Sequence, residues 1–267
     1  MNSARKGLLL ALVLGIGANA QTPSVSPGGV INAASGASVT GPVAPGSLVS
    51  IFGSDLASGL AQADSIPLST TLNNVSVTFN GVPSPLLFVS GGQVNAQLPW
   101  NVLPGGTTGS ANVVVTRSGQ ASAGQTLQVG PFSPGIFAIN NIAVAINSDG
   151  SIAAPAGAIP GVATHPAKIG DPGGLVILCT GLGAVTPANT NGAASLDALR
   201  TATTTPTVLI GNMPVTVLFA GLSPQFVGVN QVNVSLPQGT PTGDAVSIQI
   251  SQGGVTTSAT ITIAVSN

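Results

Sequence analysis

Charged side chains are scarce in this 267-residue chain, of which only 4% are Asp, Glu, Lys or Arg. An ordinary globular protein is about a quarter charged. The chain has no Glu and no Tyr, so its surface must consist of Ser, Thr, Asn, Gln and Gly. Five Lys and Arg residues in all cannot form the basic face that a phosphate backbone requires, which argues against a nucleic-acid partner. Disorder does not explain the composition, because disordered chains combine low hydrophobicity with high charge, whereas 43% of these residues are hydrophobic.

Cysteine and histidine each occur once. Cys179 cannot form an internal disulfide, and its apolar neighbourhood from Leu175 onward predicts a buried strand; an intermolecular disulfide is the alternative. His165 lies in a Pro-rich segment. Because it is the only histidine of the chain, a metal site with two imidazoles is excluded. A Ser-His-Asp triad would have to use the same histidine, and the chain has no G-x-S-x-G elbow. We therefore expect no catalytic, cofactor-binding or metal-binding residues and no enzyme activity.

One short segment has part of a calcium-loop pattern. Asn147-Ser148-Asp149-Gly150 provides a carboxylate and a turn, but the further carboxylates and the distal Glu of such a loop are missing. We interpret Asp149 as a turn residue, with a weak calcium ligand as the alternative.

The N-terminus has the three parts of a secretory signal peptide. Arg5 and Lys6 precede an apolar stretch from Gly7 to Gly17, and Ala18-Asn19-Ala20 is a small-residue cleavage site. We expect residues 1–20 to be removed and the protein to be secreted to the extracellular space or cell surface, with the periplasm as the alternative. No later stretch is long enough to span a bilayer, so the mean hydropathy of +0.53 indicates a buried β core.

The chain contains an internal duplication. Four blocks recur in the same order: PGSLVSIFGSDL with PGGLVILCTGLG, NGVPSPLLFVS with GNMPVTVLFAG, GQVNAQLPW with NQVNVSLPQ, and GSANVVVTRSGQ with GDAVSIQISQGG. The second copy carries an insertion around residues 223–226. Alternating apolar and polar residues and frequent turn signals predict an all-β chain of two tandem immunoglobulin-like β-sandwiches. We place them at residues 30–132 and 167–267, joined at 133–166 by a Pro/Gly-rich linker that contains a β-hairpin. Only residues 193–202 could form a short helical turn.

The phrase Q-V-N-x-x-L-P occurs in both copies and predicts a strand with one buried face that ends at a proline. Its amides face the other side, where they could bond loop backbone without burying charge. We interpret them as structural pins of the two domains; an amide-lined ligand face is the alternative. The residues of this motif are Gln93, Asn95 and Pro99 in the first copy and Gln231, Asn233 and Pro237 in the second.

These motifs carry a resemblance to a known family. P-G-S-L-V-S-I-F-G, N-G-V-P-x-P-L-L-F-V-S and Q-V-N-A-Q-L-P are similar to an uncharacterised Solibacter-type C-terminal domain of secreted acidobacterial proteins. Each half also resembles the IPT/TIG immunoglobulin-like domain, whose opening G-x-x-V-x-I-x-G is found here at residues 46–53. The resemblance implies tandem Ig-like folds and provides no catalytic residue to transfer.

Two binding functions remain in competition. The first is a non-catalytic module for cell-surface or matrix interaction, or for self-assembly. Self-association is suggested by the uncharged strands SANVVVT, PTVLI and ATITIAV, which would expose bare edges; the alternative is that residues 31–39 and 143–152 fold back over the edges. The second function is polysaccharide binding, for which Trp100 is the candidate aromatic platform. The other interpretation of Trp100 is that it plugs the end of a sandwich.

Overall fold

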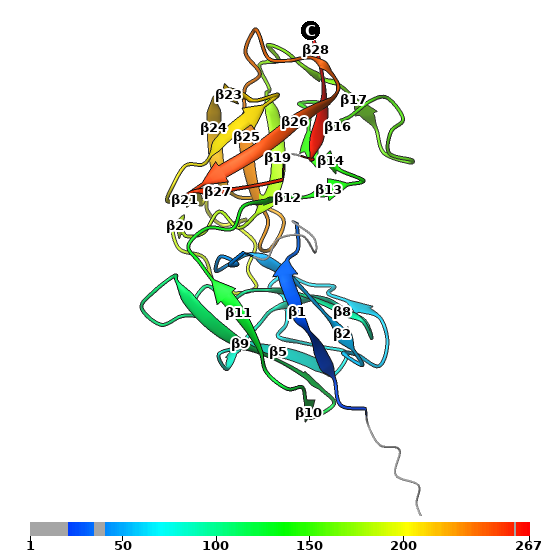
Figure 1. Ribbon diagram of the computed structural model, residues 1–267, viewed down its shortest axis with the longest axis vertical. Coiled ribbons are helices and arrows are strands. Elements are labelled where there is room, and N and C mark those ends of the chain that lie inside the picture. Colours follow the sequence, from blue (N-terminus) through cyan, green and yellow to red (C-terminus); the bar gives the residue numbers. More distant parts are fainter. Residues whose placement is uncertain (1–20, 35–40, 259) are drawn as a thin grey trace, which may run out of the picture.

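The computed structural model describes residues 21–34, 41–258 and 260–267. The expected signal peptide at residues 1–20 lies outside this range. The described residues form strands and no α-helix, which confirms the all-β prediction. Residues 193–200 are a non-helical loop, so the short helical turn predicted for 193–202 is wrong. Figure 1 shows two β-lobes stacked along the long axis of the molecule.

Two antiparallel sheets build the N-terminal lobe. The first contains, in spatial order, β1 (Ser24–Asn32), β2 (Leu48–Ser54), β8 (Gln93–Gln97), β7 (Leu86–Val89) and β3 (Ala61–Gln62). The second pairs β9 (Gly109–Arg117) with β5 (Val75–Phe79) and adds the shorter strands β4 (Thr71–Leu72), β6 (Val82–Pro83), β10 (Gln120–Ala121) and β11 (Gln125–Val129).

Two larger sheets build the C-terminal lobe. The first runs β17 (Thr164–His165), β16 (Ile152–Ala153), β15 (Ala145–Ile146), β19 (Leu175–Thr180), β25 (Asn230–Val234), β24 (Val217–Leu222), β21 (Thr201–Ala202), β20 (Val185–Thr186), with β12 (Gly135–Ile136) also on β19. The second runs β13 (Ala138–Ile139), β14 (Ile142–Ala143), β28 (Thr262–Ser266), β26 (Gly243–Gln252), β22 (Thr207–Ile210), β23 (Met213–Val215), with β18 (Ala167–Lys168) on β28 and β27 (Val255–Thr256) on β26.

Strand pairing repeats between the lobes as the sequence duplication predicts. β8 lies between β2 and β7, and its counterpart β25 lies between β19 and β24. A register shift interrupts β7 just before Phe88, and the same irregularity recurs in β24 just before Phe219. Each Phe pairs with the Asn of the repeated phrase, Asn95 or Asn233. The duplication therefore extends from the sequence to a local bulge in each sheet.

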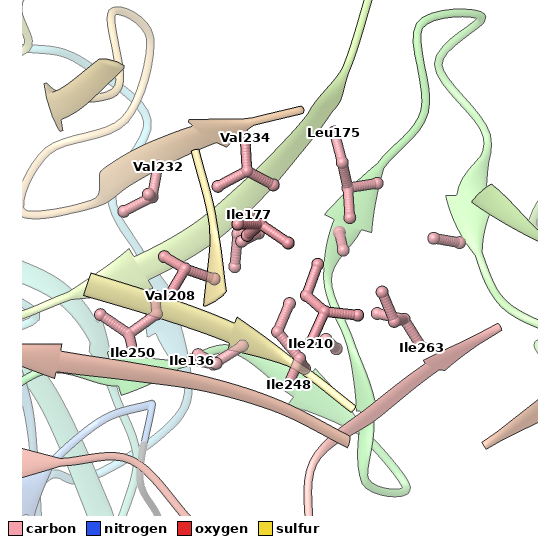
Figure 2. Packing of buried hydrophobic residues seen from close by; sticks show 14 of the residues in the cluster. Ile136, Leu175, Ile177, Val208, Ile210, Val232, Val234, Ile248, Ile250 and Ile263 are labelled. Atoms are coloured by element: carbon pink, nitrogen blue, oxygen red, sulfur yellow. The ribbon is translucent and has the colours of Figure 1, made fainter. Parts of the chain in front are cut away.

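Each lobe has its own hydrophobic core, which the alternation of apolar residues creates. Strands β5 and β25 both alternate buried and half-buried residues along their length, because successive side chains of a strand point to opposite faces. In the C-terminal lobe, residues of one sheet face residues of the other (Figure 2). The residues of this core that Figure 2 labels are Ile136, Leu175, Ile177, Val208, Ile210, Val232, Val234, Ile248, Ile250 and Ile263.

The segment predicted to be a linker, residues 133–166, is part of the C-terminal sandwich. Strands β12 and β15 pair with β19, and β14 pairs with β28. Ile136, Ala143, Ala145 and Ala153 are buried in that core. The prediction of a separate linker is therefore wrong, although the β-hairpin predicted within it is present as β15 and β16, which pair at Ile146 and Ile152. The strands of this segment are only two residues long and lie between Pro and Gly residues, so their alternation was too brief to show that they join the C-terminal sandwich.

Edge protection also differs from the prediction. The three uncharged stretches expected at edges lie in interior strands: β9 has neighbours on both sides, as do β22 and β28. Strand β15 covers β19, as the fold-back alternative for residues 143–152 predicts. Strand β1 covers β2, but it contains only residues 31 and 32 of the other predicted segment, and residues 35–39 of that segment lie outside the described part of the chain. Most outer strands have two or three residues, and β1 and β23 contain prolines (Pro27 and Pro214). Short strands and proline protect sheet edges without charge, so those stretches give no ground for edge-to-edge association.

Candidate functional site

The amides of the repeated phrase bond mainly to each other along the strand. Gln93 Nε2 donates to Asn95 Oδ1 at 2.8 Å, and Gln231 Nε2 donates to Asn233 Oδ1 at 3.3 Å. Asn95 Oδ1 also accepts a hydrogen bond from Ser50 Oγ on the neighbouring strand. All four amides are half-buried. This arrangement stabilises the outer face of each sheet, and it differs from the expected bonding to loop backbone.

Gln97 is the one amide of the first Q-V-N phrase that bonds to loop backbone. Its two hydrogen bonds reach loops of both lobes. Its Nε2 donates to Gly46 O at 3.3 Å, and its Oε1 accepts from the backbone N–H of Gly192 at 2.7 Å. The side chain is fully buried. Sequence reasoning placed Gln97 on the polar face of the strand but did not single it out, because the second copy has Ser235 at this position.

Trp100, the candidate aromatic platform, lies at the same junction. Its backbone N–H donates to Asn191 Oδ1 of the C-terminal lobe at 2.8 Å. Its ring packs so closely on Gly46 that a Cβ at that position would clash with the ring. Its Nε1 is buried without a hydrogen-bond partner among the described residues. These contacts favour the plugging role over a platform for sugars. Pro99 and Pro237 directly follow Leu98 and Leu236, both buried, just past the strands that they terminate.

Small polar groups and closely approaching backbone complete the junction. Thr180 Oγ1 accepts from the backbone N–H of Leu48 at 3.0 Å and donates to Gly228 O at 2.6 Å. Gly228 has φ +70°, and a Cβ there would lie 2.7 Å from Leu48 Cδ2. The Leu68 N–H also donates to Gly192 O at 2.9 Å. The lobes are therefore joined by directional bonds at several points, which fixes loops of both lobes against each other.

Beside this junction the loops of the two lobes enclose a cleft of about 530 Å³. From the N-terminal lobe it is lined by β3 and the loop that follows, and from the C-terminal lobe by the insertion and the residues after it. The lining residues are Gln62, Ala63, Asp64, Ser65, Ile66, Leu68, Leu87, Gln225, Phe226, Val227 and Val229. Ligand pockets span about 300 to 1,000 Å³, so this cleft has the size of a binding site.

The cleft combines exposed apolar side chains with a few polar groups. Ile66 is 48% exposed and Phe226 is 52% exposed, although both are large hydrophobic residues. Polar atoms come from Gln62, Asp64 and Gln225, and no lining residue is cationic. Exposed apolar side chains gathered in a concave site mark a binding surface. One feature of the sequence points to this site, namely the insertion at residues 223–226 that the first copy lacks.

A second hollow is also lined by a residue of the insertion, Pro224. It measures about 310 Å³ and is lined in part by Pro224, Leu196 and Leu199. The two leucines are 72% and 69% exposed. Arg200 holds this loop by a bidentate ion pair with Asp197, at 2.7 and 3.0 Å. The insertion thus lines two hollows that both carry exposed apolar residues.

Far from the cleft, the structure brings together the lone histidine and the turn aspartate. His165 Nε2 lies 2.9 Å from Asp149 Oδ2, and its Nδ1 lies 2.8 Å from Pro166 O. Because both ring nitrogens face oxygen acceptors, the carbonyl first and the carboxylate second raise the pKa of His165. Bonds from Ser151 and His165 lower the pKa of Asp149. The Ser151 N–H donates to Asp149 Oδ1, as expected for a turn residue.

Metal ligands and reactive thiols are the remaining candidates. Among the residues that the structure describes, no group of three or more His, Cys, Asp or Glu side chains is placed to hold a metal ion. Cys179 is free and fully buried, and burial raises the pKa of its thiol. A thiol in this position is packed as a small hydrophobe and is out of reach of another chain.

No helix in the described part of the chain could cross a membrane.

Comparison with known proteins finds one matching family. Residues 34–129, within the N-terminal lobe, match the IPT/TIG domain. No curated protein matches the chain. The further resemblance to an acidobacterial family stays a prediction.

Two solved structures are similar to this chain at low identity. One is the Gamma-CGTase from alkalophilic Bacillus clarkii, with 14% identity and a TM-score of 0.27 over 88% of this chain and 24% of that one. The other is the I9–I11 tandem from titin, with 11% identity and a TM-score of 0.22 over 89% of this chain and 64% of that one. The chain thus spans about a quarter of the enzyme and less than two thirds of the titin tandem. Together with the all-β architecture, the IPT/TIG match is consistent with Ig-like β-sandwich domains.

Proposed function

We propose that this protein is a secreted, non-catalytic module of two Ig-like sandwiches that binds another extracellular or cell-surface protein through the cleft at its junction. The observation that carries the proposal is the exposure of Ile66 and Phe226 in a cleft of about 530 Å³ formed by both lobes. Interfaces between proteins are centred on aromatic and aliphatic anchors that fill pockets. The junction contacts of Gln97 and Thr180 hold the two sides of the cleft in place before a partner binds, which lowers the entropic cost of binding.

Polysaccharide binding is the second candidate, and the same cleft supports it in a specific way. Phe226 is an exposed aromatic ring, and Gln62, Asp64 and Gln225 provide hydrogen-bonding groups around it. This set replaces Trp100 as the stacking candidate. The lining is nevertheless mostly aliphatic: Ala63, Ile66, Leu68, Leu87, Val227 and Val229 offer a sugar few polar partners. We therefore favour a protein partner.

Binding to cells of the organism that produces the protein tests the proposal. The purified, fluorescently labelled chain is compared with Ile66→Ser and with the control Ile139→Ser. The control removes an isoleucine of similar exposure (44%, against 48% for Ile66) from β13 outside the cleft. We expect saturable binding that protease treatment of the cells abolishes, that Ile66→Ser weakens and that Ile139→Ser preserves. Binding that resists protease but is lost after periodate oxidation would support the polysaccharide alternative. No binding, or equal loss in both variants, contradicts the proposal.

A further inference from the structure

We infer that the cleft recognises an extended peptide segment that adds as a strand to the free edge of β3 and places an apolar side chain between Ile66 and Phe226. This inference rests on the proposed function and names the form of the partner. It follows from three features that meet at one place: an unpaired sheet edge, an apolar hollow beside it and a single carboxylate at the rim.

The backbone of β3 is paired on one side only. It is the last strand of its sheet, with Ala61 opposite Val89 and Gln62 opposite Phe88 of β7. The Ala63 N–H donates to Leu87 O at 2.9 Å. Because bonded and non-bonded residues alternate in an antiparallel pair, Gln62 must direct its N–H and C=O away from β7. No described residue bonds to these two groups, so they are available to an added strand.

The apolar hollow of the cleft begins at this edge of β3. Gln62, Ala63 and Asp64 line it directly, and Phe226 closes it from the other lobe. A strand laid along β3 would therefore direct every second side chain toward either the hollow or solvent. Strand addition obtains its affinity from main-chain hydrogen bonds and its specificity from pockets for alternate side chains. The free edge of β3 supplies the main-chain groups, and the neighbouring hollow supplies the pocket, within a few residues of each other.

The charge of the cleft indicates which kind of peptide segment would bind there. Asp64 is the one acidic side chain among the lining residues, and none of them is basic. A Lys or Arg two positions from the apolar anchor would project on the same face and complement this carboxylate. A second copy of the chain offers little of this kind. Arg117 bonds to Asp55, and Arg200 bonds to Asp197. Lys168 is exposed, but it lies in β18, which is already paired with β28, between the buried residues Ala167 and Ile169. The partner segment is thus an extended, apolar and basic stretch of a different protein.

A library of random nonapeptides displayed on phage is the probe, panned on the immobilised full chain. We expect enrichment of sequences in which an apolar residue and a Lys or Arg alternate with other residues. Enrichment should disappear on Ile66→Ser and persist on Ile139→Ser. Failure to enrich, or enrichment that does not depend on Ile66, overturns the inference. Enrichment of acidic sequences would do the same.

A synthetic copy of the enriched peptide then tests the backbone geometry. N-methylation of every second residue removes the N–H groups that face β3, whereas methylation of the alternate set removes only N–H groups that face solvent. We expect one set to weaken binding at least about tenfold, the equivalent of a single lost hydrogen bond of about 1.4 kcal/mol, and the other set to have little effect. Equal effects of the two sets would exclude strand addition.

The outcomes distinguish this inference from the proposed function. Protease-sensitive cell binding that depends on Ile66, together with a peptide that is insensitive to N-methylation, overturns strand addition and leaves a protein-binding cleft. Sedimentation of the full chain at several concentrations tests whether a second copy of the chain occupies the cleft instead. A dimer that Ile66→Ser dissociates would show that a second copy fills the cleft and would overturn the inference.

Discussion

Gln97 of the N-terminal lobe accepts a hydrogen bond at 2.7 Å from the backbone N–H of Gly192 in the C-terminal lobe. Its amide nitrogen donates to Gly46 O in its own lobe. The side chain thus uses both halves of the amide in a buried site. Gln97→Glu keeps the acceptor but loses the donor and introduces a charge, so we expect a loss of about 3 kcal/mol or more in the free energy of unfolding.

The matched control is Asn95→Asp on the same strand. Both hydrogen bonds observed for Asn95 end on its oxygen, and the side chain is half-buried. A carboxylate can accept the same two bonds, so we expect a change of less than about 1 kcal/mol. Urea titrations of the two variants give the comparison. A larger loss for Asn95→Asp than for Gln97→Glu would contradict the role assigned to Gln97.

Gly228→Ala should loosen the junction. The residue has φ +70°, and the new Cβ would meet Leu48 Cδ2 at 2.7 Å. Gly239→Ala is the control, since Gly239 also has positive φ (+91°) but nothing within 4 Å of a Cβ. Both variants carry the cost of a left-handed alanine. We expect Gly228→Ala to unfold more easily by a further 1 to 3 kcal/mol, roughly the cost of overpacking. Equal thermal midpoints would show that the junction tolerates the methyl group.

The pair His165–Asp149 predicts a pH dependence of stability. The folded pKa of His165 is raised above its unfolded value, so its contribution is fully present below about pH 6.5 and is lost as pH rises through the folded pKa. Both side chains are about half exposed, which makes the effect small. An NMR titration of this single histidine should give a midpoint above about 6.5, and Asp149→Asn should lower it. A midpoint at or below that value, unchanged by Asp149→Asn, contradicts the pairing.

Cys179 should be inert in the folded protein. Its side chain is fully buried beside Ile136 of β12, and burial raises the pKa of the thiol. Because the thiolate is the reactive form, we expect no reaction with a thiol-specific chromogenic reagent until denaturant is added, and then one equivalent per chain. Rapid labelling of the native protein, or a disulfide-linked dimer on a non-reducing gel, would restore the intermolecular disulfide as an interpretation.

The sequence predicted what depends on repetition and alternation. The two Q-V-N phrases became the central strands β8 and β25, and their apolar residues Val94 and Val232 are fully buried. A period of two over five or more residues is sufficient to assign such strands and the buried face of each. Two-residue strands such as β12 and β15 carry no such period, so their membership of the C-terminal sandwich could not be predicted.

The candidate site was largely hidden from the sequence because it is formed by residues far apart in the chain. Ile66 and Phe226 are separated by 160 positions and become neighbours across one cleft only when the lobes meet. The insertion at residues 223–226 was visible as a difference between the copies. Its importance depends on the orientation of Phe226, which no local pattern determines. Trp100 looked like the better aromatic candidate, but its ring packs against Gly46.

Photo-crosslinking from the cleft shows directly whether another protein binds there. A benzophenone amino acid replaces Phe226 in one variant and Ile139 in a second, since both side chains are exposed at 52% and 44% but only Phe226 lines the cleft. Each purified variant is bound to cells of the producing organism and irradiated. We expect a protein adduct of defined mass from position 226 and none from position 139. Adducts from both positions alike, or from neither, would contradict a protein-binding cleft at the junction.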